Sequence, residues 1–149
     1  MVVQSRTIIN THHILGNTMT NIERLERCAD IMRRRWIYDP EAGLLFSRET
    51  KDVIKGGMTR KGHLNVSIQE GDFKATLSYQ KACYVYTYGA YDETLYEVHH
   101  VNMNKQDNRI KNIRLMPKEQ HRRIHKNVRK LIRLGHTQWL QPQVIEASL

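Results

Sequence analysis

The chain has 149 residues and a net charge of +9, with 24 Lys and Arg against 15 Asp and Glu. This length suits one compact core or two small subdomains, and the basic excess points to a polyanionic partner. There is no apolar run of bilayer-spanning length and no signal-peptide layout at the N-terminus, so we expect no membrane association. Cys28 and Cys83 match no disulfide or metal-ligand pattern, which favours reduced, packed thiols and a cytoplasmic protein.

The first segment, residues 1–35, is predicted to be an arm followed by a helix. Thr20 and Glu23 have the spacing of a capping box, which marks a helix start. Apolar residues then recur at helical spacing from Ile22 to Met32. We expect this helix to end near Arg34.

The second segment, residues 36–95, changes to the period of strands and is a candidate part for contact with the polyanionic partner. His63 alternates with apolar neighbours and falls on the polar side of its strand, so we expect it at the surface. Ser78 and Gly89 are suited to begin and end a helix between them. The alternation predicts one small antiparallel sheet of four short strands, at 36–38, 44–46, 64–68 and 73–77.

The third segment, residues 96–135, concentrates four of the eight histidines of the chain. His99 and His100 end a short apolar–polar alternation, which predicts a strand. A polar loop and a second apolar run follow, and Pro117 then starts a predicted helix at its first turn. Residues 136–149 form a tail with no assigned role.

His121 and His125 are four residues apart on that helix, so both imidazoles project from one face. Neighbouring strand residues point to opposite sides, so one of His99 and His100 can join that face while the other stays free. Three neutral imidazoles suit Zn²⁺ or another transition metal, with a position open for a phosphate oxygen. A free neutral histidine can take a proton from water. The spacing therefore predicts a metal site, either catalytic or structural.

Basic residues crowd the same segment. Between Lys105 and Arg133 only Asp107 and Glu119 oppose a run of Lys and Arg. Phosphate groups are bound by such side chains without regard to base sequence. We expect backbone contacts to double-stranded DNA from Arg109, Lys111, Arg114, Lys118, Arg122, Arg123, Lys126, Arg129 and Lys130.

Three short runs together resemble a known nuclease motif. The pair His99-His100, the run Asp107–Ile113 and the run Glu119–His125 are similar to the HNH motif of phage-borne and homing endonucleases. The resemblance is strong from about Tyr96 to His125 and continues weakly upstream. It implies an α+β fold, in which a small antiparallel sheet region precedes a C-terminal ββα-metal finger, also called a His-Me finger.

The resemblance also implies a role for each histidine. His100 corresponds to the general base that activates the attacking water. His99 and His121 match the two principal metal ligands, and His125 matches a third ligand seen in some members. Asn112 matches the asparagine that braces the hairpin and helps to hold the catalytic histidine. The implied cofactor is one divalent ion: Mg²⁺, Mn²⁺, Ni²⁺ or Zn²⁺.

The activity that follows is metal-dependent DNA cleavage by phosphodiester hydrolysis, with 5′-phosphate and 3′-hydroxyl products, as in a phage-encoded homing endonuclease acting in the host cytoplasm. Whether one strand or both are cut, and whether the protein is a monomer or a homodimer, stays open. Asn108 is expected to stabilise its loop rather than to take part in the chemistry. Two alternatives are a non-catalytic DNA-binding module with a structural zinc and an RNA-cleaving nuclease on the same finger.

Overall fold

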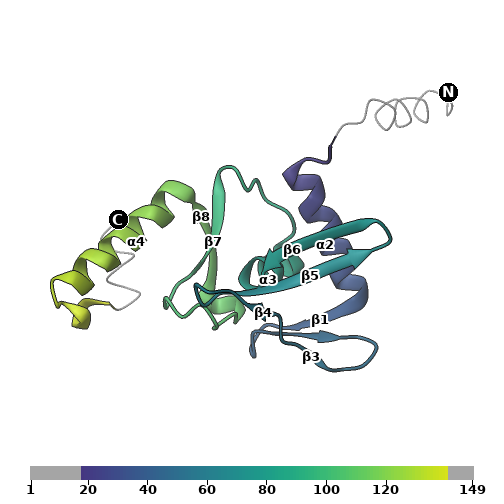
Figure 1. Ribbon diagram of the computed structural model, residues 1–149, viewed down its shortest axis with the longest axis horizontal. Helices are drawn as coiled ribbons and strands as arrows, with labels where there is room; N and C mark the ends of the chain where they lie inside the picture. The colour runs from purple at the N-terminus through teal and green to yellow at the C-terminus, as the bar shows by residue number, and fades with distance from the viewer. Residues whose placement is uncertain (1–17, 141–149) are drawn as a thin grey trace.

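The computed structural model describes residues 18–140, so nearly all of the predicted arm and most of the tail lie outside the described residues. Two helices and two small sheets come first, and a hairpin with a long helix follows (Figure 1). This arrangement confirms the expected α+β class. Within residues 18–140, no helix is both long and apolar enough to cross a membrane.

The helix α2 (Asn21–Arg35) begins at the predicted capping box. The Thr20 hydroxyl accepts from the Glu23 backbone N–H over 3.1 Å, and the Glu23 carboxylate accepts from the Thr20 N–H over 2.8 Å. This reciprocal pair satisfies two backbone donors that the first turn of a helix leaves unpaired. The buried face of α2, which includes Leu25 and Met32, packs against α3 (Tyr79–Tyr88).

The strands form two three-stranded antiparallel sheets, not the single four-stranded sheet that alternation predicted. The two extra strands, β3 (Val53–Ile54) and β4 (Gly57–Met58), have only two residues each. Strands this short leave no period in the sequence, which is why they were missed. The longer strands are β1 (Trp36–Asp39), β2 (Leu44–Ser47), β5 (Leu64–Glu70) and β6 (Phe73–Ser78).

One cluster of buried side chains joins α2, both sheets and α3 to the hairpin that follows. Ala82, Cys83 and Val85 of α3 are fully buried in it. Both cysteines are buried and free, as expected. Because this core includes Val98 and Ile113 of the hairpin, the histidine-bearing strand is anchored on the body of the protein.

The hairpin consists of β7 (Tyr96–His100) and β8 (Ile113–Pro117), joined through the short 3-10 helix η1 (Ile110–Asn112). The helix α4 (Lys118–Arg133) follows directly, and a second 3-10 turn, η2 (Thr137–Trp139), comes after it. In Figure 1 the hairpin separates α4 from the sheets.

Pro117 caps α4 instead of forming its first turn, because it still pairs with Tyr96 and has an extended ψ of 140°. Ile124 and Val128 pack the helix onto Met116 of the hairpin. Gly135, with φ of 75°, ends the helix region as predicted. The hairpin and helix thus form a ββα unit with its own small apolar cluster.

Candidate metal centre and nucleic-acid interface

Three of the four predicted histidines converge where β7 meets α4. The ligand atoms of His99, His121 and His125 all lie within 4.8 Å of one another. Nε2 of His121 and Nε2 of His125 are 2.9 Å apart. Two nitrogens held at ~2.05 Å from a tetrahedral zinc ion would be separated by roughly 3.3 Å. The donor set therefore fits one ion with little adjustment of the side chains.

Burial keeps the imidazoles of His99 and His125 in the form that binds a metal. His99 is 3% exposed, and burial lowers the pKa of this histidine to about 3, with a further contribution from the neighbouring His121. Burial is also the main cause that lowers the pKa of His125. Neutral imidazole is the ligand form, so both rings are ready to coordinate at neutral pH.

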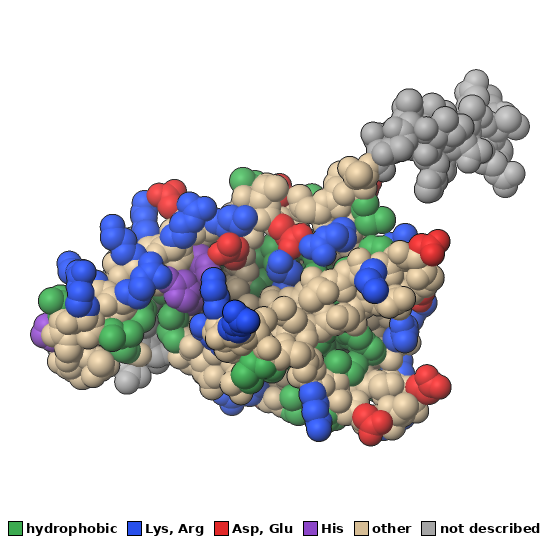
Figure 2. Space-filling view, in the orientation of Figure 1, with side chains coloured by type: hydrophobic (Ala, Val, Ile, Leu, Met, Phe, Trp, Pro, Cys, Tyr) green, Lys and Arg blue, Asp and Glu red, His purple; other side chains and the backbone are tan. Residues whose placement is uncertain are grey.

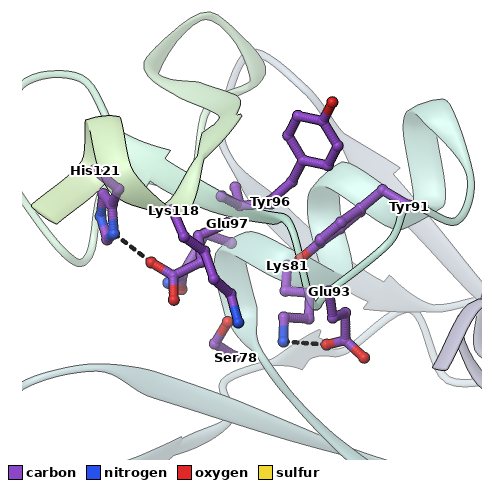
Figure 3. Close-up of a pocket in the computed structure, with 10 residues that line it drawn as sticks. Ser78, Lys81, Tyr91, Glu93, Tyr96, Glu97, Lys118 and His121 are labelled. Atoms are coloured by element: carbon purple, nitrogen blue, oxygen red, sulfur yellow. Dashed lines mark hydrogen bonds and ion pairs between the residues drawn. The ribbon is translucent and has the colours of Figure 1, made fainter.

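Glu97 orients one of the three rings. Its carboxylate accepts from Nδ1 of His121 (Figure 3). Nε2 of that ring is then left for the contact with His125. Carboxylates commonly hold the second ring nitrogen of a metal-binding histidine in this way. Glu97 was not among the predicted site residues, although it lies two positions before His99 and so on the same face of β7.

His100 has a different partner. It is 5% exposed, and its Nε2 lies 2.8 Å from Oδ1 of Asn108. An amide oxygen only accepts, so Nε2 carries the proton and Nδ1 keeps its lone pair. Burial lowers the pKa of His100, which keeps the ring neutral. The ring is therefore set to accept a proton at Nδ1.

Asn112 braces the loop between β7 and β8. Its Nδ2 donates to the Asp107 carbonyl over 2.7 Å and to Oδ1 of Asn102 over 2.9 Å, and its Oδ1 accepts from the Asn102 N–H over 2.9 Å. The resemblance implied a bracing role for Asn112, which stays a prediction with these bonds as its basis. The contact with His100 itself is made by Asn108, which we expected only to stabilise the loop.

The β1–β2 hairpin supports the same loop from outside the ββα unit. The Tyr38 hydroxyl donates to the Asn108 carbonyl over 2.6 Å, and the Pro40 carbonyl accepts from the Ile110 N–H over 3.0 Å. A Cβ atom on Gly43 would lie 2.4 Å from the Arg109 nitrogen. The two backbones are thus packed together too closely for any side chain at Gly43.

A cavity of about 220 Å³ brings these groups together. His63, for which strand alternation predicted a surface position, is half-buried and lines this cavity. It just precedes β5, where the β4–β5 turn folds over the site. The lining residues are His63, Gln80, Val98, His99, His100, Met103, Lys105, His121 and His125.

A second and more open pocket of about 490 Å³ adjoins the histidine cavity, because Gln80, Val98 and His121 line both (Figure 3). Lys118 comes into it from the start of α4, and Lys81 pairs there with Glu93 over 2.5 Å. Glu93 and Glu97 balance the two lysines, so the lining of this pocket carries no excess of positive charge.

The predicted phosphate-binding residues are spread over the outer face of the ββα unit. Figure 2 shows Lys and Arg side chains along the α4 end of the molecule, around the histidines. Arg109 differs from the rest, because its guanidinium is bidentate to Asp107 over 2.7 and 2.6 Å and holds the loop. Lys118 is half-buried, and the exposed members are Lys111, Arg114, Arg122, Arg123, Lys126, Arg129 and Lys130.

An antiparallel hairpin and a helix enclose three convergent imidazoles, with a fourth held separately, in a ββα arrangement that could hold one metal ion. The sequence model of the HNH endonuclease family matches residues 83–123, which include the hairpin and the start of α4. This segment of the chain is accordingly similar to the HNH endonuclease family. The match begins after His63 and Gln80 and ends two residues before His125.

Among solved structures, one that reports DNA binding and cleavage by the HNH homing endonuclease I-HmuI is similar to the chain, with a TM-score of 0.49 and 19% sequence identity. The similarity covers 68% of this chain and 53% of the other, so the chain spans about half the length of I-HmuI. No curated protein matches the sequence.

Proposed function

We propose that the protein is a metal-dependent DNA endonuclease of HNH type, which hydrolyses a phosphodiester bond to a 5′-phosphate and a 3′-hydroxyl. The observation that carries this proposal is that four histidines line one cavity in two different settings. His99, His121 and His125 share one potential ion, while His100 is held by Asn108 as a proton acceptor.

The three convergent histidines would hold one divalent ion: Mg²⁺, Mn²⁺, Ni²⁺ or Zn²⁺. When bound, such an ion offsets the charge that builds up on the phosphate and on the leaving 3′ oxygen. Glu97 keeps Nε2 of His121 directed at the ligand position. His100 accepts a proton from the attacking water at Nδ1, because its Nε2 is already donating to Asn108.

Duplex DNA is the proposed substrate. The exposed Lys and Arg of α4 and β8 supply backbone affinity that depends on salt and not on base sequence. Residues 36–95 are the candidate for contacts that select a site. The likeness of the motif to phage-borne and homing enzymes supports a phage-encoded homing endonuclease that acts in the host cytoplasm, as a nickase or by cutting both strands.

His100 also separates this proposal from a structural zinc module. A structural site needs ligands and no buried proton acceptor beside them, whereas His100 is buried, neutral and part of the same cavity. Supercoiled plasmid is incubated with the protein and each of the four metals, with a chelator control and a structured RNA in parallel. We expect metal-dependent relaxation of the plasmid and no cleavage of the RNA.

Two other outcomes lead to different conclusions. Plasmid that stays supercoiled with every metal, while the protein still binds it, would make the chain a DNA-binding module. Preferential cleavage of the RNA would make it a ribonuclease on the same finger.

A further inference from the structure

Two polar side chains from upstream of the HNH-matched segment line the histidine cavity. His63 lies at the start of β5, and Gln80 lies in the first turn of α3. Neither belongs to the group of ligand atoms that lie within 4.8 Å of one another. Both therefore line the cavity without being part of the candidate ligand set.

The β4–β5 turn holds His63 firmly in this position. The Thr59 N–H donates to the His63 carbonyl over 2.7 Å, and the His63 N–H donates to the Thr59 hydroxyl over 3.2 Å. The turn is also tied to the finger, because Nζ of Lys105 donates to the Lys61 carbonyl over 2.8 Å. His63 is thus placed by bonds that connect the sheet to the loop between β7 and β8.

Each of the two side chains has one polar atom that makes no hydrogen bond within residues 18–140. Nδ1 of His63 and Oε1 of Gln80 are buried and have no hydrogen-bond partner among the described residues. Gln80 is only 8% exposed. Buried polar atoms without partners are costly and uncommon, so two of them around one cavity indicate a ligand that supplies the missing bonds.

The chemistry of the two atoms indicates which part of the ligand each contacts. A phosphodiester offers only acceptor oxygens, so it can pair with an N–H on His63. Water offers donors, so it can pair with the amide oxygen of Gln80. His100 lines the same cavity, with Nδ1 set as a proton acceptor.

We propose that His63 donates from Nδ1 to a non-bridging oxygen of the scissile phosphate, and that Gln80 accepts from the attacking water and orients it toward His100. The proposal rests on the function proposed above and extends it. The residues that contact the scissile phosphate and the attacking water, His63 and Gln80, then come from the segment upstream of the finger. The family-matched segment alone would be an incomplete nuclease.

Single-turnover cleavage of a duplex DNA by the full chain tests the role of His63. We expect His63→Ala to lower the rate about 100-fold, which is the scale of losing one donor to a developing oxyanion. Metal affinity, and DNA affinity measured in a chelator, should stay within about twofold of wild type because the ligand set and basic face are intact. His136→Ala, which removes an exposed histidine outside the cavity, is the matched control and should keep the wild-type rate.

Two further variants test which nitrogen acts. The amide nitrogen of asparagine occupies a place near Nδ1 of histidine, and that of glutamine a place near Nε2. His63→Asn should therefore recover most of the lost rate, while His63→Gln should not. Gln80→Leu, which roughly keeps the volume, should lower the rate about fivefold, the scale of one neutral hydrogen bond.

A small substrate, bis(p-nitrophenyl) phosphate, separates a contact with the scissile phosphate from a contact elsewhere on DNA. If His63 acts as proposed, His63→Ala slows hydrolysis of both substrates. Three results for His63→Ala would overturn the inference and leave the proposed nuclease in place. They are a lower rate with DNA alone, a wild-type rate with both substrates, and a weakened affinity for the metal. A wild-type protein that cleaves neither substrate would overturn the proposed function, and this inference with it.

Discussion

Nε2 of His100 and Oδ1 of Asn108 are 2.8 Å apart in the buried interior of the site. This one bond decides which nitrogen of the ring is protonated, and so which nitrogen can accept a proton. The loop that carries Asn108 is in turn braced by Asn112 from within and by Tyr38 from the β1–β2 hairpin. The reactivity of His100 therefore depends on residues from two separate parts of the chain.

Asn108→Ala tests this bond. Without the acceptor, His100 can rotate or change tautomer, and we expect the cleavage rate to fall ~10- to 100-fold while metal affinity is unchanged. Asn108→Asp keeps an acceptor at this position and should retain more activity. Single-turnover cleavage and a metal titration check both variants; a wild-type rate for Asn108→Ala would show that the bond does not matter to the chemistry.

Glu97→Ala removes the carboxylate that orients His121. The ring then loses its fixed tautomer, so the affinity for a divalent ion should fall ~10- to 100-fold. Competition with a metal-binding dye measures this directly. Glu119→Ala is the matched control, because that carboxylate is exposed and its ion pair among the described residues is with Arg123, over 2.9 Å. Equal metal affinity in the two variants would refute the orienting role.

Gly43→Ala tests the packing of the β1–β2 hairpin against the loop between β7 and β8. Gly43 has φ of +70° and its Cβ would lie 2.4 Å from backbone, whereas Gly71 has φ of +56° and open space around it. Gly71→Ala should cost about 1 kcal/mol of unfolding free energy from backbone strain alone. Gly43→Ala should cost clearly more and should also slow cleavage. Urea unfolding measures both, and equal losses would mean that the loop moves aside freely.

Asp107 gives the stability of the loop a defined pH dependence. The Arg109 guanidinium bonded to its carboxylate lowers the pKa of Asp107 to about 2, against ~3.9 in an unfolded chain. A carboxyl whose pKa is lower in the folded than in the unfolded chain stabilises the folded state at pH values above its unfolded pKa. This contribution disappears as the pH falls through the folded pKa.

The difference in unfolding free energy between wild type and Asp107→Asn should therefore be constant above about pH 5 and shrink between about pH 4 and 2. Urea unfolding across this range checks the expectation. A difference that does not change with pH would mean that the ion pair contributes nothing.

Local periodicity was enough to predict the parts of the site that lie close together in the chain. The spacing of His121 and His125 placed both on one helix face, and strand alternation separated His99 from His100. The structure brings His99, not His100, to the helical pair. Glu97 could have been found by the same rule, since it shares a strand face with His99.

Contacts between distant segments could not be predicted in this way. Tyr38 and Asn108 are 70 residues apart, and no local pattern links them. His63 was assigned to the surface because alternation tells which side of a strand a residue occupies, but not what covers that side. Here the β4–β5 turn is bonded to the loop between β7 and β8 through Lys61 and Lys105, and His63 lines the cavity beside this contact.

We propose above that His100 activates water beside an ion held by His99, His121 and His125. The most direct test of this proposal compares wild type and His100→Ala in metal-loaded, single-turnover nicking of supercoiled plasmid. We expect His100→Ala to bind the same amount of metal and DNA as wild type and to lose nicking. If His100→Ala nicks the plasmid at the wild-type rate, the proton acceptor is another group and the account of the site is wrong.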